Sequence, residues 1–301
     1  MRTTRLRPLL LLGGAVLFWG SSFLATKSAM HSFSPMAVMW LRMVFASLVF
    51  LPFWRRVPRP ARRPGDRRYL LLAVVFIPCL YYLLEGFALK YTTSGQAGAV
   101  SAVFPLLVAA AAWPLLGERL SWQGGAGIAV SVGAIAVLSF TGVHQAAAPA
   151  PLLGNVLEFC AMLAATGSTL VVKHLTSRYD PWFLTGLQAA VGVVFFAPLA
   201  FAGGVPGFAA APLSTWAALL YLGVVCGLGA FGLYNSALRL LPANRAALAI
   251  NAIPVVALLG GWLVLGEALT WPQLLACALI VGAVVFAEVS GHTPADEQPV
   301  Y

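Results

Sequence analysis

Two oppositely charged residues, Arg42 and Glu85, lie inside long apolar stretches of the sequence. A charged side chain at the centre of a bilayer costs about 2.5–3.5 kcal/mol on insertion scales, and such residues commonly mark a pathway or a binding site. An arginine attracts a carboxylate, whereas a glutamate can bind an amino group or carry a proton. The two residues therefore have the chemistry needed to hold a small charged or zwitterionic molecule.

Aromatic and amide side chains accompany this pair. Tyr81 and Tyr82 precede Glu85 by four and three residues, so the three side chains share one broad face of a helix. Tyrosine and tryptophan rings can hold the apolar or aromatic portion of a bound molecule. The sequence predicts that polar and aromatic side chains within the apolar stretches surround one binding site: Trp19, Trp40, Arg42, Tyr81, Tyr82, Glu85, Gln96, Gln188, Tyr234, Asn235 and Asn251.

A structural role for the charged residues is an open alternative. Arg42 and Glu85 can pair with each other, or extend toward the membrane surface, without binding anything. For Glu158, near the start of its apolar stretch, extension toward the surface is the favoured interpretation.

The elements that position these residues follow from composition. Hydrophobic residues make up 60% of the 301 residues and charged residues 9%, and the mean hydropathy is +0.89. Soluble domains carry roughly 25% charged residues, so the composition predicts an all-α integral membrane protein. A helix needs about 20 apolar residues to cross the hydrocarbon core. Ten transmembrane helices are expected, near 9–29, 35–54, 69–90, 93–116, 122–140, 152–173, 181–202, 213–238, 243–265 and 271–289.

Basic residues orient these helices. Seven of the 18 lysines and arginines fall between Arg55 and Arg68, between two apolar stretches. Cytoplasmic loops are rich in Lys and Arg, so this loop and both chain termini are expected in the cytoplasm, in a bacterial-type inner membrane. Nucleic-acid binding is the less favoured explanation of the basic stretch, which lacks interleaved base-contacting residues. The basic, then apolar start resembles a signal peptide, but its apolar run is long enough to span, which favours an uncleaved first helix.

The two halves of the chain repeat each other. Early matches are spaced by 146 residues and later ones by 149. The first spacing pairs Lys27 with Lys173, Pro35 with Pro181 and Arg42 with Gln188. The second pairs Ala88-Leu-Lys90 with Ala237-Leu-Arg239, Glu85 with Tyr234, Pro105 with Pro254, and Gly117-Glu-Arg-Leu-Ser-Trp122 with Gly266-Glu-Ala-Leu-Thr-Trp271.

With five helices in each half, the second half must enter the membrane upside down. Two inverted five-helix repeats are therefore expected, a recurring plan of transporters in which the halves rock around a central site. The boundaries are a cytoplasmic N-terminus at 1–8, a first repeat at 9–140, a periplasmic linker at 141–151, a second repeat at 152–289 and a cytoplasmic tail at 290–301.

These motifs resemble those of the EamA family of the drug/metabolite transporter superfamily, over about residues 10 to 288. The resemblance is carried by Trp19-Gly-Ser-Ser22, Leu41-Arg42, Ala88-Leu-Lys90, Pro105 and the two Gly-Glu-x-Leu turns. It implies a ten-helix carrier that exports amino acids or other small metabolites. The partners then expected are a small-molecule substrate and the lipid bilayer, not nucleic acid.

Motifs for other chemistry are absent from the sequence. It has no P-loop, no His-Glu-x-x-His, no Gly-x-Ser-x-Gly and no Cys-x-x-Cys. No enzyme activity, metal or cofactor is therefore expected, and transport is either facilitated or driven by an ion gradient. A lipid-handling protein or a membrane enzyme using the same cavity is the alternative.

Two further expectations concern residues at matching positions in the two halves. Lys27, Lys90, Lys173 and Arg239 lie near the ends of apolar stretches and are interpreted as interfacial anchors, the alternative being a cationic vestibule at each mouth. The Pro105 and Pro254 pair marks either flexible points near the cavity or fixed bends.

Overall fold

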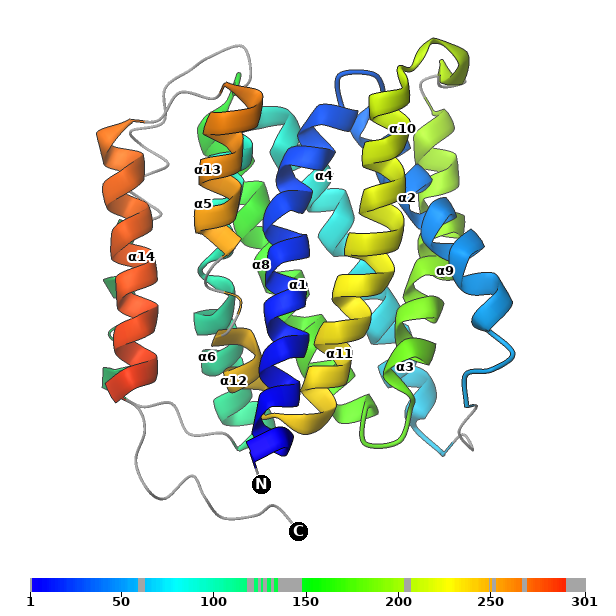
Figure 1. Cartoon of the computed structure of the whole chain (residues 1–301). Helices are drawn as coiled ribbons and strands as arrows, with labels where there is room; N and C mark the ends of the chain where they lie inside the picture. The colour runs from blue at the N-terminus through cyan, green and yellow to red at the C-terminus, as the bar shows by residue number, and fades with distance from the viewer. Residues whose placement is uncertain are drawn as a thin grey trace.

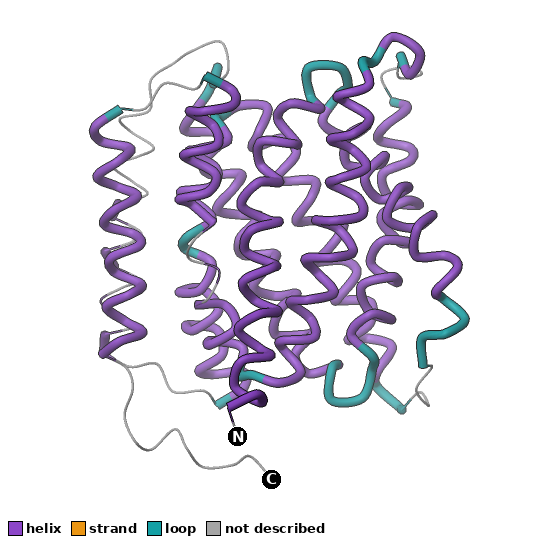
Figure 2. The backbone as a smooth tube through the Cα atoms, viewed as in Figure 1, coloured by secondary structure: helices purple, strands orange, loops and turns teal. Residues whose placement is uncertain are grey.

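The chain folds into a bundle of helices, as a computed structural model shows (Figure 2). The structure describes residues 2–58, 63–117, 122–123, 126, 129–130, 133–134, 148–202, 207–248, 250, 253–266 and 270–290. No strand occurs among these residues. The predicted all-α class is therefore confirmed for this part of the chain.

Seven helical segments among the described residues are long and apolar enough to cross a bilayer. Each overlaps a predicted span, but a total of ten is not confirmed. The predicted span 122–140 lies largely outside the described residues. The span 243–265 is divided, and 271–289 corresponds to α14 (Trp271–Ser290). The seven segments are Leu10–Ala29, Pro35–Phe53, Asp66–Tyr91, Ser94–Leu115, Pro151–Leu175, Pro181–Phe201 and Leu213–Leu240.

The first two helices of each half are regular. They are α1 (Arg2–Ala29) and α2 (Pro35–Phe50), then α8 (Pro151–Leu175) and α9 (Pro181–Phe201). Both second helices start in the same way, with a proline preceded by a capping side chain. Ser34 accepts a hydrogen bond from the Ala37 N–H, and Asp180 accepts one from the Trp182 N–H. Such caps satisfy free N–H groups in the first turn, while proline there loses no helical hydrogen bond.

The third spanning segment of each half changes its helical winding midway. In the first half α3 (Asp66–Val74) is joined to α4 (Tyr81–Tyr91) through η2 (Val75–Leu80), where the π-helical winding is broken by a kink at Ile77 (φ −131°, ψ 122°), directly before Pro78. In the second half α10 (Leu213–Leu220) passes through the π-helical stretch η4 (Tyr221–Ala230) into α11 (Phe231–Leu240). π-helical stretches are rare and occur often at functional sites. Both third spans thus depart from a regular α-helix at matching positions, and only η2 is kinked at a proline.

The fourth spanning segment is interrupted. α5 (Ser94–Ser101) and α6 (Phe104–Leu116) are separate helices, and so are α12 (Ala243–Leu248) and α13 (Ile253–Leu265). Pro105 and Pro254 follow the two breaks directly and cannot donate the backbone hydrogen bond that would continue the helix. Gly117 and Gly266, which follow α6 and α13, have φ values of 72° and 66°, a conformation that glycine adopts without steric cost.

Helices from the two halves pack against each other throughout the bundle (Figure 1). α2 lies against its repeat mate α9. α5 lies against α13 and α6 against α12, so the fourth spans of the two halves also meet. α4 lies against α8, and α1 lies against α11, which is the same contact repeated with the halves exchanged. The short elements η1 (Leu51–Phe53) and η3 (Phe208–Ala210) lie in the connections. The centre of the bundle is therefore shared by both halves.

Two lysines fix this arrangement at matching positions. The Lys27 Nζ donates to the carbonyls of Leu89 and Thr92, each at 2.6 Å, at the end of α4. The Lys173 Nζ donates to the carbonyls of Leu238 and Leu241, at 2.8 and 2.6 Å, at the end of α11. A cation at a helix C-terminus compensates both the free carbonyls and the helix dipole. These contacts, in addition to interfacial anchoring, explain why a lysine stands at the matching position in each half.

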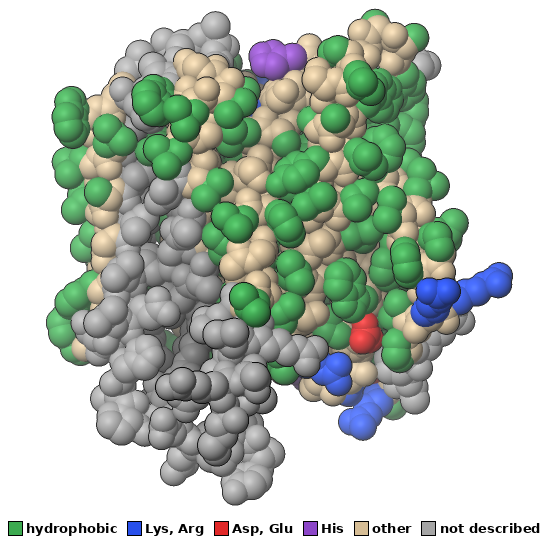
Figure 3. All heavy atoms as spheres, in the orientation of Figure 1, with side chains coloured by type: hydrophobic (Ala, Val, Ile, Leu, Met, Phe, Trp, Pro, Cys, Tyr) green, Lys and Arg blue, Asp and Glu red, His purple; other side chains and the backbone are tan. Residues whose placement is uncertain are grey.

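The surface is apolar around the visible middle of the bundle (Figure 3). Most Lys and Arg side chains visible in that view gather at the end where α3 begins, and Arg55, Arg56, Arg67 and Arg68 at this end are exposed. There Arg178 pairs with Asp66, with 2.8 Å between Nη1 and Oδ1. The distribution of charge therefore suits a protein that spans a bilayer.

We expect Lys27→Met to destabilise the protein by about 2 kcal/mol, because two carbonyls at the end of α4 lose a charged donor. Lys173→Met should have a similar effect on α11. Thermal unfolding in detergent measures both changes, with Lys90→Met as the control because Lys90 is exposed on α4. Equal unfolding temperatures for all three variants would contradict the capping role.

Candidate functional site

The centre of the bundle contains a buried ion pair between α2 and α4. The Nη1 atom of Arg42 lies 3.6 Å from Oε2 of Glu85, and the two side chains are 2% and 4% exposed. The Tyr81 hydroxyl donates to Oε1 of Glu85 at 2.5 Å. The guanidinium of Arg42 stacks on Tyr82, with 4.3 Å from Cζ to the ring centre. Four of the predicted site residues thus form one cluster.

The ion pair is not saturated with hydrogen bonds. Among the described residues, the Arg42 Nε donor and the Glu85 Oε2 acceptor have no hydrogen-bond partner. A 3.6 Å separation is too long for a hydrogen bond between the two groups themselves. Buried polar atoms are normally satisfied, and exceptions often have a functional reason. The pair therefore retains one donor and one acceptor for a further molecule.

An aromatic wall extends from this pair toward α1 and α11. The Trp19 ring lies 4.8 Å from that of Phe231 and 5.2 Å from that of Tyr234, between centres. Phe231 in turn lies 6.2 Å from Tyr82. These distances are typical of favourable aromatic pairs. The predicted Trp19, Tyr82 and Tyr234 are thus joined through Phe231.

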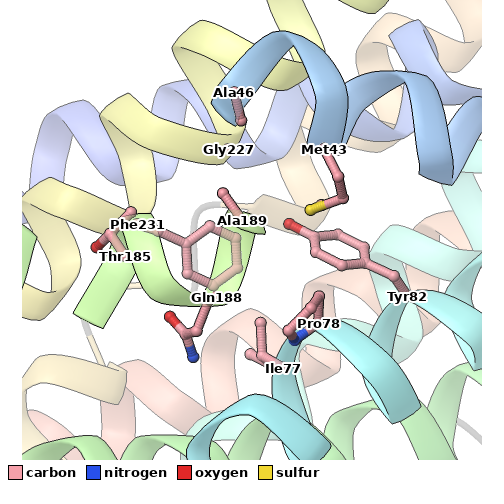
Figure 4. A pocket seen from close by; sticks show the side chains of 10 residues that line it. All are labelled: Met43, Ala46, Ile77, Pro78, Tyr82, Thr185, Gln188, Ala189, Gly227 and Phe231. Atoms are coloured by element: carbon pink, nitrogen blue, oxygen red, sulfur yellow. The ribbon is translucent and has the colours of Figure 1, made fainter. Parts of the chain in front are cut away.

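A narrow cavity opens beside the aromatic wall (Figure 4). Tyr82 approaches it from α4, Gln188 from α9 and Phe231 from α11. The centres of water molecules have about 20 Å³ in which to lie, which is room for about one water. Pockets that bind small ligands measure about 300–1,000 Å³. In this conformation the cavity does not admit a metabolite, so binding requires the helices to separate.

Two amides of the predicted site lie on the second half of the bundle. The Gln188 Nε2 donates to the Ala73 carbonyl at 3.3 Å and reaches the Ser168 hydroxyl at 3.5 Å. The Asn235 Nδ2 donates to the Thr185 hydroxyl at 3.0 Å. Both side chains are buried. Gln188 occupies the position that Arg42 has in the first repeat, so only the first half supplies a cation there.

Two other predicted residues make contacts outside this cluster. Gln96 accepts hydrogen bonds from Thr92 at 2.8 Å and from Asn155 at 3.3 Å, which forms a polar cluster at the start of α5. Trp40 packs on Phe201 with 5.0 Å between ring centres. Asn251 lies outside the described residues.

Glu158 requires a correction. The sequence favours its extension toward the membrane surface, but the side chain is 0% exposed. Gly154, one turn earlier on α8, lies against the Ala88 carbonyl of α4, so the face of α8 that carries Glu158 is turned toward α4. Sequence position alone does not reveal this contact. Glu158 therefore belongs to the central cluster.

Sequence reasoning also missed Phe231. The repeat offers a signal, since the spacing of 149 residues pairs Phe231 with Tyr82, a residue that was selected. No such signal exists for Thr185, whose hydroxyl is common in apolar helices. Among the described residues, no group of three or more His, Cys, Asp or Glu side chains could hold a metal ion.

Removing one member of the ion pair should be more costly than removing both charges. We expect Arg42→Met to destabilise the protein by about 3–5 kcal/mol, because Glu85 then stays buried without its cation. Adding Glu85→Gln should recover part of this loss. Thermal unfolding of the single and double variants in detergent gives the coupling energy, and additive effects would show that the pair does not interact.

Comparison with known proteins identifies the family to which this chain is similar. Residues 6–140 and 152–288 each match the EamA-like transporter family. An uncharacterized transporter from Archaeoglobus fulgidus is 26% identical over 265 residues, covering 86% of this chain and 89% of its own. The transporter YcxC of Bacillus subtilis, also uncharacterized, is 25% identical, covering 90% and 89%.

One similar protein has a more specific name. A probable terminal-alkyne amino-acid exporter from Streptantibioticus cattleyicolor is 28% identical over 284 residues, covering 91% of this chain and 89% of its own. A solved crystal structure shares the fold with a TM-score of 0.67 and 21% identity, covering 94% of this chain and 96% of the other. The family and these named relatives are transporters rather than enzymes. The two matched repeats establish that this multi-pass membrane protein belongs to the EamA-like transporter family.

Proposed function

We propose that the protein exports amino acids or closely related small metabolites from the cell. The supporting observation is the unsaturated Arg42–Glu85 pair, buried between α2 and α4 beside aromatic rings from both halves. An amino acid carries a carboxylate and an ammonium group on one carbon atom. The pair offers a guanidinium and a carboxylate side by side, which matches both groups.

Binding exchanges one set of charge contacts for another. The substrate carboxylate takes the free donor of Arg42, and the substrate ammonium takes the free acceptor of Glu85. Without substrate the two side chains compensate each other, so no isolated charge remains in the apolar interior. Trp19, Phe231 and Tyr82 then contact the substrate side chain. This arrangement favours substrates with an apolar or aromatic portion.

Transport proceeds by alternating access. Packing between the halves leaves space for about one water beside Tyr82, so the halves must separate for substrate to enter. Each fourth span consists of two helices, α5 and α6 in the first half and α12 and α13 in the second. Discontinuous helices of this kind border the substrate sites of several transporters built from inverted repeats. We assign the two moving units to residues 9–140 and 152–289.

Orientation and direction complete the proposal. The basic loop at Arg55–Arg68 lies in the cytoplasm of an inner membrane, together with both chain termini. Export is favoured because one relative is named a probable amino-acid exporter. The candidate site consists of Trp19, Trp40, Arg42, Tyr81, Tyr82, Glu85, Gln96, Gln188, Tyr234, Asn235 and Asn251.

Counterflow in proteoliposomes tests this function. Liposomes loaded with one amino acid at a time should accumulate the labelled form of a transported substrate, with apolar and aromatic amino acids screened first. Arg42→Ala and Glu85→Gln should lower the initial rate at least tenfold, because each loses a charged contact worth about 1.5–3 kcal/mol.

Matched controls separate this effect from a general loss of charge. Arg239→Ala removes an exposed arginine from α11, and Asp180→Asn changes a carboxyl to an amide that still caps α9. Both should keep the wild-type rate. Unchanged counterflow in Arg42→Ala and Glu85→Gln would overturn the site assignment, and accumulation of none of the screened compounds would overturn the substrate class.

A further inference from the structure

Glu158 has the least compensated carboxyl group in the described part of the chain. It lies in α8 and is completely buried. Neither of its two carboxyl oxygens has a hydrogen-bond partner among the described residues. An ionised carboxylate in an apolar interior is strongly disfavoured unless it is paired and hydrogen-bonded.

Glu158 and Glu85 lie at similar depth on neighbouring helices. The Ala150 N–H donates to the Tyr91 carbonyl at 3.2 Å, which joins the end of α4 to the start of α8. From this junction Glu85 is about 9 Å back along α4 and Glu158 about 12 Å along α8, at about 1.5 Å per residue. On the facing sides of the two helices, Gly154, one turn before Glu158, lies against the Ala88 carbonyl, about one turn after Glu85.

The contact is not a requirement of the fold. The equivalent contact in the other half lies between α1 and α11. There the repeat places Leu12 opposite Glu158 and Tyr234 opposite Glu85, and both are buried. Since the bundle packs the same contact with no carboxyl group, the two glutamates at the α4–α8 contact need a different explanation.

The positive and negative charges around the α4–α8 contact do not balance. Arg42 supplies one positive charge, whereas Glu85 and Glu158 together supply two negative charges when both are ionised. Like-charged carboxylates that share a site cannot readily both ionise. One bound proton makes the cluster of Arg42, Glu85 and Glu158 neutral.

Other ionisable groups around α8 do not provide the positive charge that would neutralise the second carboxylate. Asp66, Tyr69, His174 and Arg178 contact one another at the far end of α8. Lys173 is bonded to the end of α11. Tyr81 donates to Glu85, and the Cys226 thiol donates to the Phe18 carbonyl. The described ionisable groups on α8 and on the helices packed against it that remain are Arg67, Arg68, Cys79, Tyr82, Lys90, Tyr91, Cys160, Tyr234 and Arg239.

We propose that Glu158 and Glu85 share one proton, and that this proton couples transport to the proton gradient. The inference rests on the proposed carrier function and adds its driving ion. The proton enters from water on one side when the halves part there, binds the carboxyl pair, and leaves as a hydrated proton when the pair opens to the other side.

The shared proton also controls the packing of the halves. Glu85 belongs to the first half and Glu158 to the second. With the proton bound, α4 and α8 pack closely, as observed. When it leaves, two buried carboxylates repel across the contact, which favours separation of the helices. Proton binding is thereby linked to the movement that exposes the substrate site.

Two measurements test the proposal. The first is an infrared difference titration of the purified protein in nanodiscs without substrate. The wild type should show a protonated-carboxyl band that disappears as the pH rises. Glu158→Gln should lose this band, because Arg42 compensates the remaining Glu85 carboxylate. In Glu85→Gln the band should disappear at a lower pH than in the wild type, because Glu158 then has no second carboxylate near it. Asp180→Asn should keep the wild-type band.

The second measurement uses proteoliposomes that contain a pH-sensitive dye. In the wild type and in Asp180→Asn, a gradient of transported substrate should change the internal pH. In Glu158→Gln no pH change should accompany the exchange of labelled substrate that remains. A coupled pH change in Glu158→Gln, or substrate movement without any pH change in the wild type, would overturn the coupling.

The two measurements test different parts of the account, so their outcomes separate the proposed function from the proton site. If no amino acid is transported by the wild type, the proposed function fails, while the infrared titration still reports the proton site. If the wild-type carboxyl band persists unchanged in Glu158→Gln, the proton site is wrong even where transport is present. If the Glu158→Gln variant does not fold, Glu85→Gln decides, and a band that titrates at the wild-type pH in that variant would overturn the shared site.

Discussion

Compensation of charge inside an apolar bundle is the constraint on which this structure depends. A charged or hydrogen-bonding group in hydrocarbon has no water to satisfy it, so a partner must come from the protein. Lys27 and Lys173 meet the carbonyls at the ends of α4 and α11. Arg42 and Glu85 meet each other. Where compensation is complete the contact holds the scaffold together, and where it is incomplete a site for another charged species remains.

The duplicated sequence separates these two roles. Features present in both halves build the scaffold: the lysines, the capped prolines, the π-helical stretches and the broken fourth spans. Features present in one half lie at the centre. Arg42 stands opposite Gln188, Glu85 opposite Tyr234, and Glu158 opposite Leu12. A nearly symmetric frame thus surrounds an asymmetric polar centre.

Much of the scaffold could be predicted from the sequence because its signals are local. Apolar length located the spans, and the repeat predicted the matching of Lys27 with Lys173. The partners of individual side chains could not be predicted, since they depend on which helices pack together. The burial of Glu158 against α4 and the bond from Lys27 to α4 both come from such contacts. η4 has no clear local signal, because its residues are ordinary small and apolar ones, whereas Pro78 marks the kink in η2.

The central claim is that one buried centre opens in turn to each side of the membrane. Gln188→Cys, in a chain whose four native cysteines are replaced, tests it most directly, because Gln188 is 6% exposed and borders the cavity. The measurement is the rate of reaction with a membrane-impermeant thiol reagent added to either side of oriented vesicles. The account predicts reaction from both sides, with transported substrate slowing both rates. Reaction from one side alone, whether or not substrate is present, would contradict it.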